Sequence, residues 1–269
     1  MHERISVNSL CFPEAGWPEL AQHWRQCGAR RASFLSPLLD VGVDSIQKVL
    51  ADGGLKLETI THLFTNGQLG PRGDDWAPER KLLSRVIDAA ASLGSNSVYM
   101  MCGGHGDLVW EEAAAEFARA VAPCAEQAKA AGVALLVEPA PPLYADGHIA
   151  HSLRDTLALA EIAGLGVCID VYSCWWEAEL QRTIEHALPR CHLVQISDYK
   201  YGDRAYPSRA IPGEGDIPLE RILGWILDAG YRGNFDFELI GPRMAEAGYD
   251  EAVKRAGDYT SELLARLGV

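Results

Sequence analysis

The chain has 269 residues, enough for one large α/β domain or two small ones. Its formal net charge is 24 − 37 = −13 and no run of Lys or Arg stands out, which argues against nucleic-acid binding. Seven cysteines without a C-x-x-C pair are typical of reduced thiols. Because the sequence shows neither a signal-peptide pattern nor a membrane-spanning apolar run, we expect a cytoplasmic protein.

Short apolar runs alternate along the chain with longer segments of helical period. The apolar runs predict strands over residues 5–11, 32–35, 57–64, 97–102, 133–137, 167–170, 193–196 and 235–239. The periodic segments predict helices over residues 17–27, 44–51, 78–93, 111–131, 152–162, 176–188, 219–228 and 250–267. Several of these helices are followed by glycine, as helix ends commonly are.

This strict alternation of strands and helices favours one fold. Strands that are apolar at consecutive positions are typical of parallel strands buried on both faces. Eight β/α units in about 250 residues predict a single (β/α)8 TIM barrel over residues 1–269, with its active site at the C-terminal ends of the strands. The alternative is an open doubly wound sheet, but no G-x-G-x-x-G follows an early strand.

The last four predicted strands each end with a polar side chain in an apolar run. Glu138 ends LLVEP, Asp170 ends VCIDV, Gln195 interrupts LVQIS and Glu238 lies in FDFELIG. In a barrel these four side chains would surround one mouth. We therefore interpret them as parts of a single site.

Three carboxylates at one mouth would repel one another, and no Lys or Arg lies on these strands to compensate them. We therefore expect a divalent metal ion held by Glu138, Asp170, Glu238 and the amide oxygen of Gln195. Oxygen ligands favour Mn²⁺, Mg²⁺ or Co²⁺ over soft-ligand zinc chemistry, and two open positions would suit an α-hydroxycarbonyl compound. The alternatives are that each acid caps a helix and that Gln195 is a core amide.

Three further polar residues are candidate substrate contacts. His62 lies near the end of the third predicted strand, His105 follows the fourth, and Arg209 lies three residues before P-G-E-G. Each also has a purely structural interpretation. The histidines could belong to the core or to loops, and Arg209 could be a solvated loop residue.

At these residues the chain resembles the xylose-isomerase-like TIM barrels, a superfamily of sugar isomerases and epimerases that also contains metal-dependent AP endonucleases. The shared signature is E-P after strand five, D after strand six, a polar-x-x-D after strand seven, G-E-G-D-I-P and a final F-E. Hydroxypyruvate-isomerase-like members use glutamine in a Q-I-x-D context, which Gln195 and Asp198 match. The resemblance implies that Arg209 binds an anionic or polyhydroxy end of the substrate.

Two positions depart from the family pattern. Ser173 stands where relatives often place a substrate-binding histidine, and Tyr144 stands where sugar 3-epimerases commonly have a second glutamate. Both residues remain candidate substrate contacts. The departures leave the substrate open and do not affect the four proposed ligands.

The sequence thus predicts a metal-dependent isomerase or epimerase of a small sugar or hydroxycarbonyl compound. Glu138 and Glu238 would remove and return a proton on carbon across a metal-stabilised enediolate. The runner-up is a lyase or dehydratase on the same scaffold. Cleavage of abasic DNA conflicts with the acidic charge, and a metal-free sugar-binding barrel is the non-enzyme alternative. A homo-oligomer is compatible with the resemblance, because dimers and tetramers are common in the superfamily.

Overall fold

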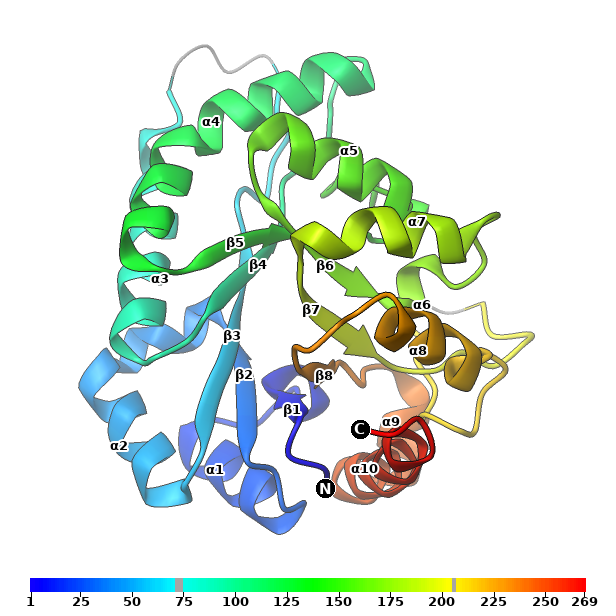
Figure 1. The fold of residues 1–269 in the computed structure, drawn as a ribbon. Helices are drawn as coiled ribbons and strands as arrows, with labels where there is room; N and C mark the ends of the chain where they lie inside the picture. Colours follow the sequence, from blue (N-terminus) through cyan, green and yellow to red (C-terminus); the bar gives the residue numbers. More distant parts are fainter. Residues whose placement is uncertain (71–74, 205–206) are drawn as a thin grey trace.

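The computed structural model describes residues 1–70, 75–204 and 207–269. Within these residues, parallel strands pair in chain order and close into a barrel, because β1 also pairs with β8 (Figure 1). The strands are β1 Ile5–Asn8, β2 Arg31–Leu35, β3 Lys56–Leu63, β4 Ser97–Met101, β5 Ala134–Val137, β6 Gly166–Asp170, β7 Cys191–Ile196 and β8 Phe235–Phe237. The predicted TIM barrel is confirmed, and closure excludes the open doubly wound sheet.

Helices surround the barrel (Figure 1). The longer ones are α1 Trp17–Gln26, α2 Val43–Gly53, α3 Ala77–Ser92, α4 Trp110–Ala131, α5 Leu153–Ala163, α7 Leu180–Ala187, α8 Leu219–Asp228 and α10 Tyr249–Arg266. Shorter ones are α6 Val171–Cys174, α9 Pro242–Ala247 and the 3-10 helices η1 Ser9–Cys11, η2 Ser36–Val41, η3 Pro142–Tyr144 and η4 Leu188–Arg190. In the described part of the chain, no helix combines the length and the apolar character needed to cross a bilayer.

Two predicted boundaries were wrong by three or more residues, for local reasons. The strand predicted over residues 5–11 ends at Asn8, whose side chain accepts a hydrogen bond from the N–H of Leu10 and so begins η1. The helix predicted over residues 176–188 begins at Leu180, since Glu179 has a left-handed backbone with φ of 55°. The residues just after β6 form α6 instead, which is capped by the side chain of Asp170.

The barrel interior has an apolar side and a polar side. Side chains from β4 to β7 pack on one another as a small cluster separate from the main core, namely Tyr99, Leu136, Cys168 and Leu193. Strands β8, β1, β2 and β3 contribute hydrogen-bonded polar side chains, namely Asp236, Asn8, Ser33 and Thr61. The main apolar core lies between the strands and the surrounding helices. The polar side was not predicted from the sequence.

Candidate metal centre

Three carboxylates meet at the C-terminal ends of the barrel strands. Glu138 directly follows β5, Asp170 ends β6 and Glu238 directly follows β8. One oxygen atom of each lies within 4.8 Å of the others, and all three residues are buried. The fold therefore brings together the three acids that the sequence placed in one site. All of them line a cavity of about 1040 Å³ at the barrel mouth.

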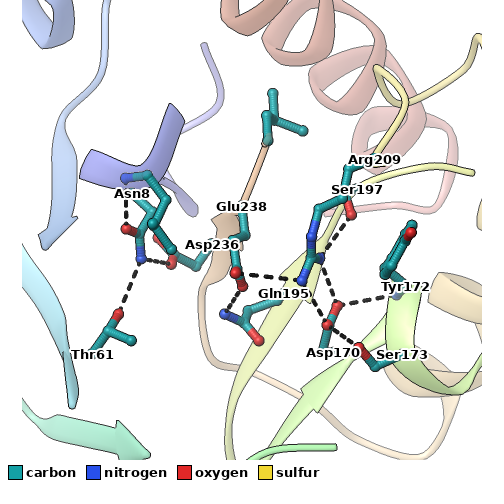
Figure 2. Close-up of polar contacts among 12 residues, drawn as sticks. Asn8, Thr61, Asp170, Tyr172, Ser173, Gln195, Ser197, Arg209, Asp236 and Glu238 are labelled. Carbon is teal, nitrogen blue, oxygen red and sulfur yellow. Dashed lines mark hydrogen bonds and ion pairs between the residues drawn. The ribbon is translucent and has the colours of Figure 1, made fainter. Parts of the chain in front are cut away.

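Arg209 lies among these acids, which the sequence argument did not anticipate. Its guanidinium donates to both carboxylate oxygens of Asp170, at 3.2 and 3.0 Å, and lies 3.4 Å from Oε1 of Glu238 (Figure 2). It also donates to Oγ of Ser197 at 2.9 Å and packs 4.5 Å from the ring centre of Tyr172. The expectation that only a metal ion balances the acids was therefore wrong, because Arg209 compensates one of their three charges.

The loop that carries Arg209 is held by Asp198. The Asp198 carboxylate accepts four backbone N–H bonds, from Tyr199 at 2.8 Å, Gly213 at 3.0 Å, Gly215 at 3.2 Å and Ile217 at 2.9 Å. A Cβ on Gly215 would lie 2.1 Å from Oδ1 of Asp198, so the second glycine of G-E-G makes this approach possible. The sequence marked Asp198 as part of the family signature, and the structure shows its physical role.

Gln195 is fully buried between the barrel interior and the acids. Its amide nitrogen donates to Oε2 of Glu238 at 2.7 Å (Figure 2). Its amide oxygen accepts from Sγ of Cys168 at 3.3 Å. In this orientation the side chain stabilises the Glu238 carboxylate. Ligation of a cation requires the amide to turn so that its oxygen faces the site, and this role stays a prediction.

Burial and mutual repulsion dominate the electrostatics of the site. Burial, with the neighbouring charges of Glu238 and Asp170, raises the pKa of Glu138 well above its usual range. Burial raises the pKa of Glu238 to about 7, although the Arg209 guanidinium opposes the rise. Without a cation, Glu138 and Glu238 therefore keep their protons to higher pH than exposed glutamates do. Three buried oxygen donors of this kind fit a hard divalent ion, which would favour their ionised forms.

His148 fixes the backbone that carries Glu138, and sequence reasoning missed it. Its Nε2 donates to the carbonyl oxygen of Glu138 at 2.7 Å, and its Nδ1 accepts from the N–H of Cys102 at 3.2 Å. Burial lowers the pKa of His148 to about 4, so the ring is neutral at physiological pH. It joins the end of β4 to the end of β5.

The predicted substrate contacts lie in different places. Ser173 lines the cavity and donates to Oδ2 of Asp170 at 2.5 Å, and Tyr144 lines it from the loop after β5. His62 also lines the cavity, but from outside the barrel. Its neighbour Thr61 forms a hydrogen bond with Asn8 inside the barrel, and successive side chains of a strand point to opposite faces. The Nδ1 atom of His62 lies 2.9 Å from Oγ of Ser36. His105 lies outside the described cavity lining, and its Nδ1 donates to the carbonyl of Gly106 at 3.0 Å.

A buried polar network lies on the polar side of the barrel interior. Nδ2 of Asn8 is 3.2 Å from Oδ2 of Asp236 and 3.3 Å from Oγ1 of Thr61 (Figure 2). It is also 3.2 Å from the hydroxyl of Tyr99. Ser33 also donates to Asp236. Burial raises the pKa of Asp236 to about 6 despite these hydrogen bonds. Asp236 was missed, although its spacing of two residues from Glu238 places both side chains on the same side of the extended chain.

A closed barrel with charged side chains gathered at the C-terminal ends of its strands is the arrangement of TIM-barrel enzymes. The sequence pattern of the Xylose isomerase-like TIM barrel family matches residues 15–259, and the chain belongs to this family. An inosose isomerase of Halalkalibacterium halodurans is 31% identical over 75 residues, which are 28% of this chain and 27% of that protein. This match therefore spans about a quarter of the relative's length.

Solved structures share the fold over nearly the whole chain. D-psicose 3-epimerase with D-tagatose from Clostridium cellulolyticum H10 is 14% identical, with a TM-score of 0.80 and coverage of 97% and 99% of the two chains. The IOLI protein with a bound zinc atom is 14% identical, with a TM-score of 0.81 and 98% coverage of each chain. The probable 3-DHS dehydratase AsbF of Bacillus anthracis is 14% identical, with a TM-score of 0.73 and coverage of 93% and 97%. At these identities the likeness shows the fold alone.

Proposed function

We propose that this protein is a divalent-metal-dependent isomerase or epimerase of a small sugar or hydroxycarbonyl compound. The observation that carries the proposal is the meeting of Glu138, Asp170 and Glu238 in one buried cluster that lines a cavity at the barrel mouth. Membership in the family supports it, since its structural neighbours include a sugar 3-epimerase.

The metal would be held by Glu138, Asp170 and Glu238, with Gln195 as a fourth ligand once its amide oxygen faces the site. When bound, the ion supplies Lewis-acid polarisation of the substrate carbonyl and stabilises negative charge on it. The all-oxygen donor set favours Mn²⁺, Mg²⁺ or Co²⁺. The IOLI neighbour holds zinc, so elemental analysis of the purified protein is the direct test of metal identity.

Glu138 and Glu238 are the groups that would move the proton on carbon. They project from β5 and β8, with two strands between them, so they approach the centre of the mouth from different sides. A carboxylate with a pKa near the working pH can both accept and return a proton, and burial shifts both residues in that direction. One acid would take the proton from carbon, and the other, protonated before turnover, would donate its own proton to the enediolate.

Arg209 would orient the substrate, because its guanidinium lies beside the acids and lines the same cavity. Ser173 and Tyr144 also line the cavity and offer hydroxyl groups to a polyhydroxy compound. His62 would contribute only where the cavity extends outward from the barrel. A role for His105 has no support from the cavity lining and stays a sequence prediction.

The test is solvent-deuterium incorporation into a panel of ketoses and hydroxyketoacids, followed by NMR with the Mn²⁺-loaded protein. We expect incorporation at the carbon beside a carbonyl, and its loss in Glu138→Gln and Glu238→Gln while circular dichroism shows an intact fold. Wild-type turnover in either variant would contradict the two-base scheme. Loss of water or of a leaving group from the product would instead identify the lyase or dehydratase alternative, which begins with the same proton removal.

A further inference from the structure

The cavity at the barrel mouth continues outward between α2 and α3. Its volume of about 1040 Å³ is at the upper end of the roughly 300–1,000 Å³ that small-molecule pockets occupy. A hydroxycarbonyl compound of a few carbons beside the acids would fill only the inner part. The outer part, called here the α2–α3 groove, is lined by the apolar residues Leu39, Val43, Leu82, Val86 and Ala89 and by polar ones that include Asp44, Gln47, Arg85 and Asp88.

An apolar stripe lies on the α3 side of the α2–α3 groove. Leu82, Val86 and Ala89 follow one another on one face of α3, at spacings of four and three residues. Val86 and Ala89 are buried, whereas the Leu82 side chain is 51% exposed. Leu63, at the end of β3, also lines the cavity and is 46% exposed. Exposed large apolar side chains around a concave surface are typical of a binding site.

We propose that the substrate carries an alkyl or aryl group that lies in the α2–α3 groove while its hydroxycarbonyl end reaches Glu138, Asp170 and Glu238. The inference rests on the proposed function for the polar end. Continuity of one cavity from the acids to the groove favours a single ligand over a separate protein partner. Each methylene group buried on Leu82, Val86 and Ala89 would add to affinity through the hydrophobic effect.

The experiment is calorimetric titration of the Mn²⁺-loaded protein with hydroxyacetone, 1-hydroxy-2-hexanone and 1-hydroxy-2-decanone. We expect the dissociation constant to fall at least about tenfold from the shortest to the longest compound. Leu82→Glu places a charge in the groove and should remove most of this gain without affecting hydroxyacetone. Ile162→Glu is the matched control, since Ile162 is a helical residue on α5 with 49% exposure and lies outside the cavity lining.

Equal affinity for all three compounds would overturn the proposal, as would equal effects of Leu82→Glu and Ile162→Glu. So would sedimentation data in which Leu82→Glu dissociates an oligomer while ligand affinity stays unchanged, because the groove would then be a subunit interface. Glu138→Gln separates this proposal from the proposed function. If that variant keeps the gain with chain length and also binds hydroxyacetone normally, the groove stands and the metal-centred function fails.

Discussion

Replacing Glu238 by glutamine should change how the stability of the metal-free protein depends on pH. Burial raises the pKa of Glu238 from 4.5 to about 7. Between these values the unfolded chain releases this proton and the folded chain keeps it, so the folded state binds more protons. The contribution of the protonated side chain to stability is therefore full below about pH 4.5 and is lost as the pH rises through 7.

The size of the effect follows from the pKa difference. A shift of roughly 2.5 units corresponds to about 3 kcal/mol, at about 1.36 kcal/mol per unit. Glu238 is only 8% exposed, so solvent screening reduces this value little. Glutamine has no proton to release, and groups that do not interact with Glu238 cancel in the comparison. Repulsion between Glu238 and Glu138, which together with burial raises the pKa of Glu138, acts in the same direction. The free energy of unfolding of the wild type minus that of Glu238→Gln should therefore fall by up to about 3 kcal/mol between pH 4.5 and 8.

The assay is urea denaturation in EDTA at pH 4.5, 6, 7 and 8, followed by tryptophan fluorescence. Glu262→Gln, on an exposed position of α10, controls for loss of an acid elsewhere. A wild-type-minus-Glu238→Gln difference that stays flat across this range would refute the reasoning. Saturating Mn²⁺ should stabilise the wild type more than Glu238→Gln at pH 8, because only the carboxylate offers a charged ligand.

Other substitutions test the neighbours of the acids. Arg209→Met leaves Asp170 without its buried cationic partner and should lower the free energy of unfolding of the metal-free protein by about 3–5 kcal/mol in urea titrations; a loss below about 1 kcal/mol would contradict the pairing. His148→Ala removes the hydrogen bonds that His148 makes to the buried backbone groups of Cys102 and Glu138, and should lower the free energy of unfolding by about 2–5 kcal/mol. His105→Ala should lower it by less than about 1 kcal/mol in the same assay. Mn²⁺ should raise the thermal midpoint of the metal-free wild type by several degrees but not that of Asp170→Asn; an equal rise in both would place the ion elsewhere.

The barrel and its three acids were predictable because their positions depend on local patterns. Apolar runs and helical periods marked the strands, and parallel connection places the C-terminal ends of all strands at one edge. Glu138, Asp170 and Glu238 each follow or end such a run, so their meeting required no knowledge of loops. The same reasoning predicted α8 at Leu219–Asp228 without error.

What the sequence did not show depends on long-range contacts or on the choice of strand face. Arg209 is 39 residues from Asp170, and its position comes from a loop that folds back onto Asp198 and Ile240. His62 could be placed on either face of β3 until the bond between Thr61 and Asn8 fixed the alternation. Short-range patterns carry no information about either contact.

The hydrogen bonds of Asp170 reconcile the observed ion pairing of Arg209 with its proposed role in substrate binding. A carboxylate offers about four lone-pair positions, and those of Asp170 accept from Arg209 twice, from the hydroxyl of Ser173 and from the N–H of Tyr172. A cation that binds Asp170 therefore has to displace at least one of these donors. Arg209 is the donor whose release also frees a positive charge inside the cavity, where a polar substrate group can accept from it. We therefore propose that Arg209 balances the acids before an ion binds and holds the substrate afterwards.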